Sequence, residues 1–224
     1  IGRRFHDVSL LEDQAFMLDK IIRSIEEQSI DIVIIAGDIY DKTNPSEGSF
    51  DLWDRFLVGL SKLKCIVICI SGNHDSQQRL SFGSQLFENH DIHMGAPLTQ
   101  EITPIEVDTI RFYPIPFIGP SMVRNVHESF TGTSYEEAYA FLVDSIGTLD
   151  SNYTNILIGH QYFIYGDEVK LSDSETLSLG GSEAINITLL KDFDYVACGH
   201  IHRSQQIGLE TRRYSGSLLT YSFS

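Results

Sequence analysis

The chain has 224 residues, of which 42% are hydrophobic and 21% are charged, which is the composition of an ordinary soluble protein. No apolar run is long enough to span a membrane, which argues against a membrane-embedded protein. The formal net charge of −15 argues against a wholly basic nucleic-acid binder, although it leaves room for local contacts with DNA. No linker, charge block or repeat divides the sequence, so we expect a single domain over residues 1–224.

The first part of the chain alternates helices and strands. Ser9 and Glu12 have the spacing of a capping box, and the helix expected after them carries apolar residues at helical intervals, namely Leu11, Ala15, Leu18, Ile22 and Ile25. A strand is predicted over residues 30–38. A second helix is predicted to begin near Ser46, after Pro45, and to carry Leu52, Trp53, Phe56, Leu57 and Leu60.

A second apolar strand, Cys65–Ile70, is followed by a third predicted helix over about 77–88. These repeated strand–helix units predict a mainly parallel sheet that is covered by helices.

The later part has a different pattern. Residues 105–107 and 110–112 are predicted to form a hairpin around Asp108 and Thr109, and residues 113–117 are expected to leave the sheet. Ser134 and Glu137 form another capping box, at the start of a helix to about residue 148.

After the strand that ends at residue 160, the polar segment 166–181 has the length of a functional or mobile loop. Residues 205–209 and 211–217 are predicted to form a second hairpin about Glu210. A parallel part joined to an antiparallel part predicts an α/β fold with a two-layered mixed sheet flanked by helices.

Four predicted strands end in glycine and are followed directly by polar residues. Each glycine precedes residues able to bind metal, phosphate or protons, namely Asp38, Asn73-His74-Asp75, His160, and His200-Ile201-His202. Any one of these sequences is ordinary turn chemistry. Four of them together predict one site, because ligands collect at the carboxyl ends of the strands in open α/β sheets.

The residue types predict a metal site. Asp38 offers an anionic oxygen that can bridge two cations, Asn73 offers a carbonyl oxygen, and His160, His200 and His202 offer imidazole nitrogens. Nitrogen and oxygen ligands without thiolate suit manganese, iron or zinc better than calcium. If residues 200–202 are extended, both histidine rings lie on one face and each can reach a different metal. Two metals that activate water and hold a phosphoryl group favour phosphoester hydrolysis.

His74 follows Asn73 and, by alternation, is expected to point away from it. It can therefore contact the scissile phosphate or protonate the leaving oxygen. Asp75 either orients His74 or caps the next helix, and we favour the cap.

The remaining candidates have simpler interpretations. Cys65, Cys69 and Cys198 lie in predicted buried strands and form no C-x-x-C pair, as expected for reduced thiols in a cytoplasmic protein. The histidines without a motif are interpreted as surface residues: His6, His90, His93 and His127.

The four motifs, in this order and each after a strand, resemble those of the calcineurin-like metallophosphoesterases. Further features resemble the SbcD family of bacterial nuclease subunits over essentially the whole chain: Gly2-Arg3-Arg4, Asp38-Ile39-Tyr40-Asp41, Ser172-Asp173-Ser174-Glu175 and Arg213-Tyr214-Ser215-Gly216-Ser217. The resemblance implies a manganese-dependent exonuclease and endonuclease that acts on DNA ends and hairpins in repair, recombination and replication. It also implies a complex with the coiled-coil ATPase SbcC.

The same resemblance implies roles for individual residues. Asp38 is the bridging ligand, His74 is the catalytic histidine, and the other ligands of two Mn²⁺ ions are Asn73, His160, His200 and His202. Asp41 lies where archaeal relatives carry a second histidine. Asp41, Arg79 and Arg203 are therefore candidates for substrate binding, although each arginine by itself is more simply a solvated surface residue.

Relatives in the SbcD family dimerise through the two helices that follow Asp38 and Asn73. Here those helices carry more aromatic and aliphatic surface than a sheet-covering face needs, in Phe50, Phe82, Leu86 and Phe87. We expect a homodimer, and the alternative is that these residues complete the core.

Two departures from the family pattern shape a further expectation. The Asp-x-His motif of the first strand would directly precede Ile1, and a DNA-capping domain with an ATPase-binding segment would follow Ser224. We expect a protein that truly begins at Ile1 to bind at most one metal tightly, to have little nuclease activity, and to be less stable than one with the preceding strand.

Two other functions stay open. One is a protein phosphatase or a phosphodiesterase for small phosphodiesters on the same fold. Protein phosphatases typically have Gly-Asp-x-x-Asp-Arg and Gly-Asn-His-Glu, whereas this chain has Lys42 and Asp75 at the final positions. The other is a scaffold that has lost catalysis, against which the five intact ligand positions argue.

Overall fold

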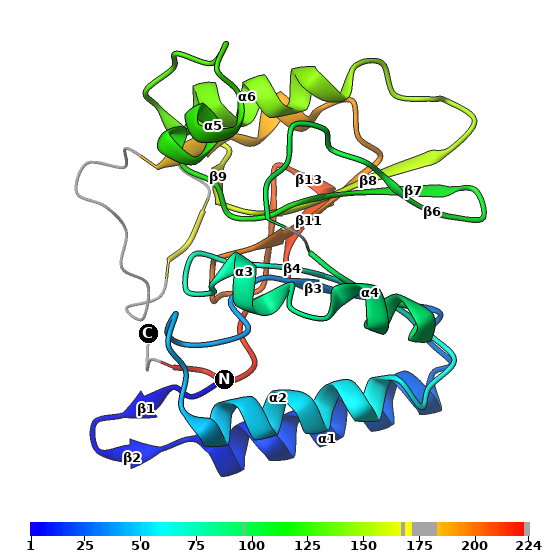
Figure 1. The fold of residues 1–224 in the computed structure, drawn as a ribbon, viewed down its shortest axis with the longest axis vertical. Coiled ribbons are helices and arrows are strands. Elements are labelled where there is room, and N and C mark those ends of the chain that lie inside the picture. Colours follow the sequence, from blue (N-terminus) through cyan, green and yellow to red (C-terminus); the bar gives the residue numbers. More distant parts are fainter. Residues whose placement is uncertain (96, 167–168, 172–182, 222–224) are drawn as a thin grey trace.

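The computed structural model describes residues 1–95, 97–166, 169–171 and 183–221, and two stacked sheets lie at its centre (Figure 1). The smaller sheet has three parallel strands, β3 (Ile32–Ala36), β4 (Ile66–Ile70) and β5 (Ile92–Met94). β3 and β4 pair in register from Ile32 opposite Ile66 to Ala36 opposite Ile70, so both strands end at the same edge. This edge carries the first two of the predicted motifs.

The larger sheet has six strands in the order β12-β13-β11-β8-β7-β6. The four inner strands run parallel, namely β7 (Ile110–Ile115), β8 (Thr154–His160), β11 (Tyr195–Gly199) and β13 (Leu209–Tyr214). The outer strands β6 (Ile105–Val107) and β12 (Gln205–Ile207) are antiparallel to their neighbours. The predicted mixed sheet is confirmed.

Apolar side chains join the two sheets and attach helices to their outer faces. Ile68 and Ile70 of β4 pack in one cluster with Phe112 of β7 and Ile158 of β8, between the sheets. The helices α1 (Leu11–Glu27) and α2 (Glu47–Leu60) cover the smaller sheet, whereas α5 (Pro120–Val126) and α6 (Tyr135–Ile146) cover the larger one (Figure 1). All five apolar residues predicted for the second helix are buried.

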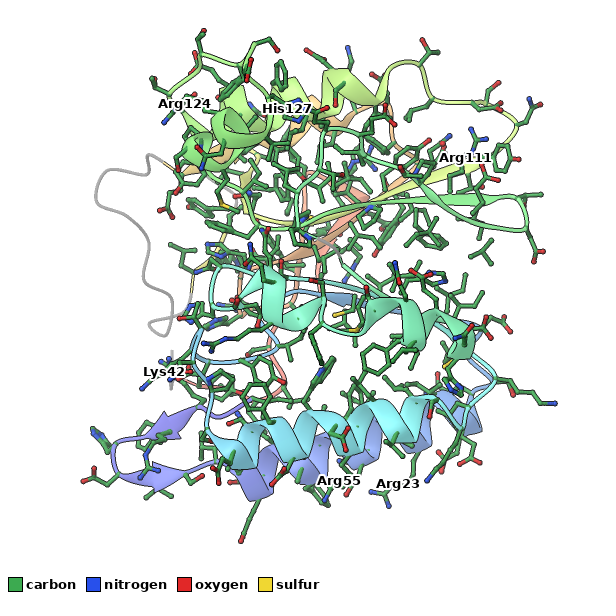
Figure 2. All side chains as sticks on the ribbon, viewed as in Figure 1. Arg23, Lys42, Arg55, Arg111, Arg124 and His127 are labelled. Atoms are coloured by element: carbon green, nitrogen blue, oxygen red, sulfur yellow. The ribbon has the colours of Figure 1, made fainter. Side chains whose placement is uncertain are left out.

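Figure 2 shows side chains filling the space between these layers, with Arg23 and Arg55 on the outer side of α1 and α2. No helix in the part of the chain that the structure describes is both long and apolar enough to cross a membrane. The three cysteines are buried and free, as predicted.

Two helix predictions need correction. Ser9 belongs to the strand β2 (Val8–Ser9), which pairs with β1 (Arg4–Phe5), so no side chain caps the start of α1 and the predicted capping box is wrong. The predicted third helix is divided into α3 (Gln77–Leu80), α4 (Ser84–Phe87) and a 3₁₀ turn, η1 (Glu88–His90). The division falls at Gly83, whose φ of 76° is left-handed and ends a right-handed helix. The capping box of Ser134 and Glu137 is confirmed.

Two strand predictions also need correction. β7 continues through residues 113–115, which were expected to leave the sheet. Pro114 is tolerated there because β6 pairs only with Ile110–Phe112, so the ladder on that side has already ended. The last hairpin turns at Gly208, with a φ of 65°, instead of at Glu210.

A short parallel pair, β9 (Tyr162–Ile164) and β10 (Ala184–Asn186), and the 3₁₀ turn η2 (Ile187–Leu190) complete the fold. Most of the predicted loop 166–181 lies outside the described residues.

Candidate metal centre

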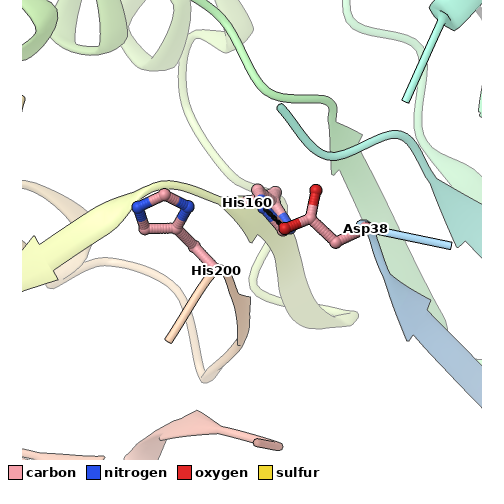
Figure 3. A group of neighbouring side chains, drawn as sticks. All are labelled: Asp38, His160 and His200. Atoms are coloured by element: carbon pink, nitrogen blue, oxygen red, sulfur yellow. Dashed lines mark ion pairs between the residues drawn. The ribbon is translucent and has the colours of Figure 1, made fainter. Parts of the chain in front are cut away.

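Four strand ends bring the predicted ligands together where the two sheets meet. Asp38 follows β3, Asn73 follows β4, His160 is the last residue of β8, and His200 follows β11. Ligand atoms of Asp38, His160 and His200 all lie within 4.8 Å of one another. Figure 3 shows these three side chains as neighbours. The stacking of the sheets therefore assembles the site from segments far apart in the sequence.

The Asn73 side chain lies among these groups. Its Oδ1 atom is 3.1 Å from Nε2 of His160 and 3.1 Å from Nδ1 of His200. Oδ2 of Asp38 is 3.3 Å from the same Nε2 of His160. Two oxygen and two nitrogen ligands thus point toward one small volume.

The environment of His160 fits a bound cation. Its Nδ1 atom lies 2.6 Å from the carbonyl oxygen of Ala36, and a carbonyl only accepts, so Nδ1 carries a proton. Nε2 then faces two acceptor oxygens, those of Asp38 and Asn73, which requires either a second proton or a metal ion. Burial lowers the pKa of His160, but the charge and hydrogen bond of Asp38, the Ala36 carbonyl and the charge of Asp75 together raise the pKa above its usual value. A proton and a metal cation would therefore compete for the same position at Nε2.

The two other ionisable candidate ligands, Asp38 and His200, have charge states that suit a metal. Burial raises the pKa of Asp38, but the charge and hydrogen bond of His160 and the N–H of His74 hold it well below its usual range. Burial lowers the pKa of His200 to about 3, and the neighbouring charge of His160 contributes. An ionised carboxylate and a neutral imidazole are suitable ligands for a divalent transition metal.

Two of the motif glycines allow the close approach of the strand ends. A Cβ atom on Gly199 would overlap the Ala36 carbonyl oxygen and lie 2.7 Å from Nδ1 of His160. A Cβ atom on Gly72 would overlap the Asp38 carboxylate and lie 2.7 Å from Cε1 of His160. Any larger residue at either position would separate the ligands.

The His200-Ile201-His202 segment differs from the prediction. The backbone at His200 has a φ of 99°, so it is not extended, and the expected pair of rings on one face does not form in that way. A cavity of about 590 Å³ lies at the site and is lined by Asp38, Asn73, His160 and His200. His202 lies outside the 4.8 Å group of ligand atoms but lines this cavity too. Its ring centroid is 6.2 Å from that of Tyr221.

His74 lines this cavity and has a defined ring orientation. Its Nδ1 atom is 2.7 Å from the carbonyl oxygen of Asp41, so Nδ1 carries a proton and Nε2 is the atom available to a substrate. The Asp41 carboxylate is paired with Arg3 at 2.9 Å. Both Asp41 and Arg3 line the cavity.

Asp75 is not the helix cap that we favoured. The Ser76 side chain accepts from the N–H of Arg79 and caps α3 instead. The Asp75 carboxylate is buried and accepts the backbone N–H groups of Gly72, Tyr40 and Ile39. Burial raises the pKa of Asp75, and the three donors act in the opposite direction.

The two candidate arginines are Arg79 and Arg203. Neither is among the described residues that line the cavity. Arg79, on α3, donates to the carbonyl of Thr43 and to Oδ1 of Asn44, each at 2.9 Å. Arg203 follows His202 and is exposed.

Sequence reasoning missed the aromatic neighbour of the ligands, Phe117. Its ring is 6.4 Å from that of His200 in a nearly parallel arrangement and 6.3 Å from that of His160. Phe117 belongs to none of the motifs, so no pattern indicated it. The roles of the Ala36 carbonyl and of Arg3 were missed too, although Arg3 belongs to a sequence that carried the family resemblance.

Comparison with known proteins identifies the family of the chain. Residues 6–204 match the family model described as calcineurin-like phosphoesterase, and the chain belongs to that family. More particularly, the chain is similar to the SbcD subunit of nuclease SbcCD from Staphylococcus epidermidis, with 36% identity over 227 aligned residues. The alignment covers 100% of this chain and 60% of the relative, so the chain spans about 60% of that protein's length. Both resemblances predicted from the motifs are confirmed.

Proposed function

We propose that this protein is a metal-dependent nuclease that hydrolyses phosphodiester bonds in DNA, as an exonuclease and as an endonuclease at hairpins and ends. One observation carries the proposal. Asn73 Oδ1, the Asp38 carboxylate and the nitrogens of His160 and His200 converge on one volume beside a cavity lined by His74. The similarity to a subunit of the nuclease SbcCD supports DNA as the substrate.

The ligand set favours two divalent ions, which we propose to be Mn²⁺. Asp38, Asn73, His160 and His200 would hold one ion, and His202 would contribute to a second. When bound, such ions would activate water and neutralise negative charge on the phosphoryl group.

The chain's own residues position the substrate and move the proton. The Asp41 carbonyl fixes the ring of His74, so that Nε2 faces the cavity. In its protonated form, His74 donates from Nε2 to the leaving oxygen. Arg3 lies at the same cavity and is 39% exposed, so it can approach a phosphate of the DNA backbone.

We further propose that the protein acts in the cytoplasm, in DNA repair, recombination and replication, as the nuclease subunit of a complex with the coiled-coil ATPase SbcC. The similar protein is itself a subunit of SbcCD, which supports this assignment. Asp41, Arg79 and Arg203 remain candidates for DNA contact.

A homodimer is part of the proposal. Phe82 is 85% exposed and Leu86 is 71% exposed, on the segment that follows Asn73, and Phe50 on α2 is 43% exposed. Large exposed apolar patches usually mark an interface. Phe87 supports the alternative instead, because it packs against the cluster beneath α1 and α2.

The test uses full-length protein and a labelled DNA hairpin with Mn²⁺. We expect cleavage that EDTA abolishes and that the Asp38→Asn variant lacks. Asp108→Asn, in the turn between β6 and β7, is the matched control and should cleave as the wild type does. Absence of any Mn²⁺-dependent cleavage by the wild type would contradict the proposal and favour a scaffold that has lost catalysis.

The rival enzyme is separated by substrate. Cleavage of bis(p-nitrophenyl) phosphate without cleavage of DNA would favour a phosphodiesterase for small molecules. The protein phosphatase is disfavoured because Lys42 stands at the position of its motif arginine and Asp75 at that of its motif glutamate. The Lys42 side chain lies exposed at the surface (Figure 2).

A further inference from the structure

The buried carboxylate of Asp75 connects the two loops that carry the first two metal motifs. Asp75 is only 7% exposed. Its oxygens accept the N–H of Gly72 at 2.8 Å, that of Tyr40 at 3.0 Å and that of Ile39 at 3.2 Å. Ile39 and Tyr40 follow the ligand Asp38, whereas Gly72 precedes the ligand Asn73.

A second hydrogen bond runs in the opposite direction between the same loops. Oδ1 of Asp38 accepts the backbone N–H of His74 at 3.0 Å. Each loop therefore supplies a carboxylate that accepts backbone N–H groups of the other loop. This reciprocal arrangement leaves Oδ2 of Asp38 facing His160.

The backbone at Asp38 needs such support. Its φ of 54° lies in the left-handed region, which costs free energy for a residue with a side chain. The two N–H groups directly after this residue are those that Asp75 accepts. Strained backbone persists only where its surroundings fix it, and Asp75 supplies that restraint.

We propose that Asp75 is a positioning residue, which holds Asp38 and Asn73 at the spacing that metal binding requires. This inference rests on the proposed metal-dependent function of the site. Residues that orient metal ligands typically change metal affinity by about 10–100-fold when they are replaced. A purely local role in starting α3 is excluded by Ser76, which performs it.

The test compares Asp75→Asn with the wild type by calorimetric titration of Mn²⁺. An asparagine keeps the size of the side chain but turns an NH₂ group toward at least one backbone N–H, so the restraint is lost. We expect the affinity for Mn²⁺ to fall about 10–100-fold. Hydrolysis at low Mn²⁺ should fall with it and should recover in part at high Mn²⁺.

A destabilised control separates positioning from general stability. Leu142→Ala removes a buried side chain of α6, on the outer side of the larger sheet, and should lower stability without changing Mn²⁺ affinity. Equal affinity of Asp75→Asn and the wild type would overturn the inference. An equal loss of affinity in Leu142→Ala would overturn it too. If the wild type itself binds no Mn²⁺, the proposed function fails instead.

Hydrogen exchange of the metal-free wild type keeps the inference testable even if Asp75→Asn does not fold. The amides of Gly72, Ile39 and Tyr40 should exchange slowly, at rates close to those of the adjoining strands β3 and β4. Exchange at the rate of an open loop would show that the carboxylate does not hold these residues, and the inference would be wrong.

Discussion

Nδ1 of His160, at the end of β8, lies 2.6 Å from the carbonyl oxygen of Ala36, at the end of β3. The two residues belong to different sheets, so this hydrogen bond sets the orientation of a candidate metal ligand from across the interface between them. A backbone carbonyl that accepts from a ligating histidine fixes its tautomer and ring orientation. The metal site therefore depends on the stacking of the two sheets.

The first prediction follows from that dependence. A ligand that binds only the folded protein stabilises it, by about 2.7 kcal/mol at a concentration 100 times its Kd. We expect Mn²⁺ to raise the midpoint of thermal unfolding, and EDTA to reverse the effect. Scanning calorimetry with and without Mn²⁺ measures it. An unchanged midpoint at saturating Mn²⁺ would contradict the assignment of the ligands.

The second prediction concerns pH. The raised pKa of His160 stabilises the metal-free fold below the unfolded value of about 6.5, and this stabilisation is lost as the pH rises through the folded pKa. A metal must displace the same proton, so the affinity for Mn²⁺ should fall as the pH is lowered, and binding should release protons. Titration calorimetry in buffers of different ionisation enthalpy counts the protons. Binding that is independent of pH would show that Nε2 is not a ligand.

The third prediction assigns His74 to proton transfer and not to metal binding. Its ring is held by the Asp41 carbonyl, outside the 4.8 Å group of ligand atoms. His74→Ala should keep its affinity for Mn²⁺ and lose about 10²–10⁴-fold in the rate of DNA hydrolysis. His90→Ala, in the exposed turn η1, is the control and should behave as the wild type does. Loss of metal by His74→Ala would reverse the assignment.

Much of the fold could be predicted from local sequence. The β-branched runs of β3 and β4 predicted strands, and the apolar spacing in α2 predicted a helix. Both predictions hold because each segment buries its own apolar side chains in the structure that its pattern indicates. The breaks were harder to predict. The division at Gly83 depends on a left-handed φ that glycine permits but does not require, and the position of Pro114 in β7 depends on where β6 ends.

In the candidate site too, features set by local sequence could be predicted, whereas contacts between distant segments could not. The motifs indicated the candidate ligands that the structure brings together, because each follows its own strand, whereas His202 lies outside the group of close ligand atoms. The role of Asp75 could not be read from the sequence, since its partners Ile39 and Tyr40 lie 36 and 35 residues away. Phe117 was missed for the same reason, because only the packing of the two sheets places it beside His200.

The fourth prediction tests the close approach of β3 and β11. Gly199→Ala would place a methyl group against the Ala36 carbonyl and His160, so the strand ends must separate. We expect a loss of about 1–3 kcal/mol in the free energy of unfolding, together with weaker Mn²⁺ binding. Denaturant unfolding and metal titration measure the two effects. Gly48→Ala in α2 is the control and should leave Mn²⁺ binding unchanged, and a normal affinity in Gly199→Ala would contradict the prediction.

The last prediction concerns the proposed homodimer. Phe82 and Leu86 expose most of their apolar surface near α3 and α4. Exposed apolar surface adds no burial free energy to an isolated chain, whereas an interface would remove that surface from water. If they form the centre of an interface, a charge at either position should cost about 2 kcal/mol of association free energy, equivalent to roughly 30-fold in the dimer Kd. Light scattering over a range of micromolar concentrations should therefore show a dimer for the wild type and a monomer for Phe82→Glu and Leu86→Glu. Leu209→Glu, at a 64% exposed position of β13, adds the same charge elsewhere and should remain dimeric. A monomeric wild type would mean that these side chains serve another purpose than self-association.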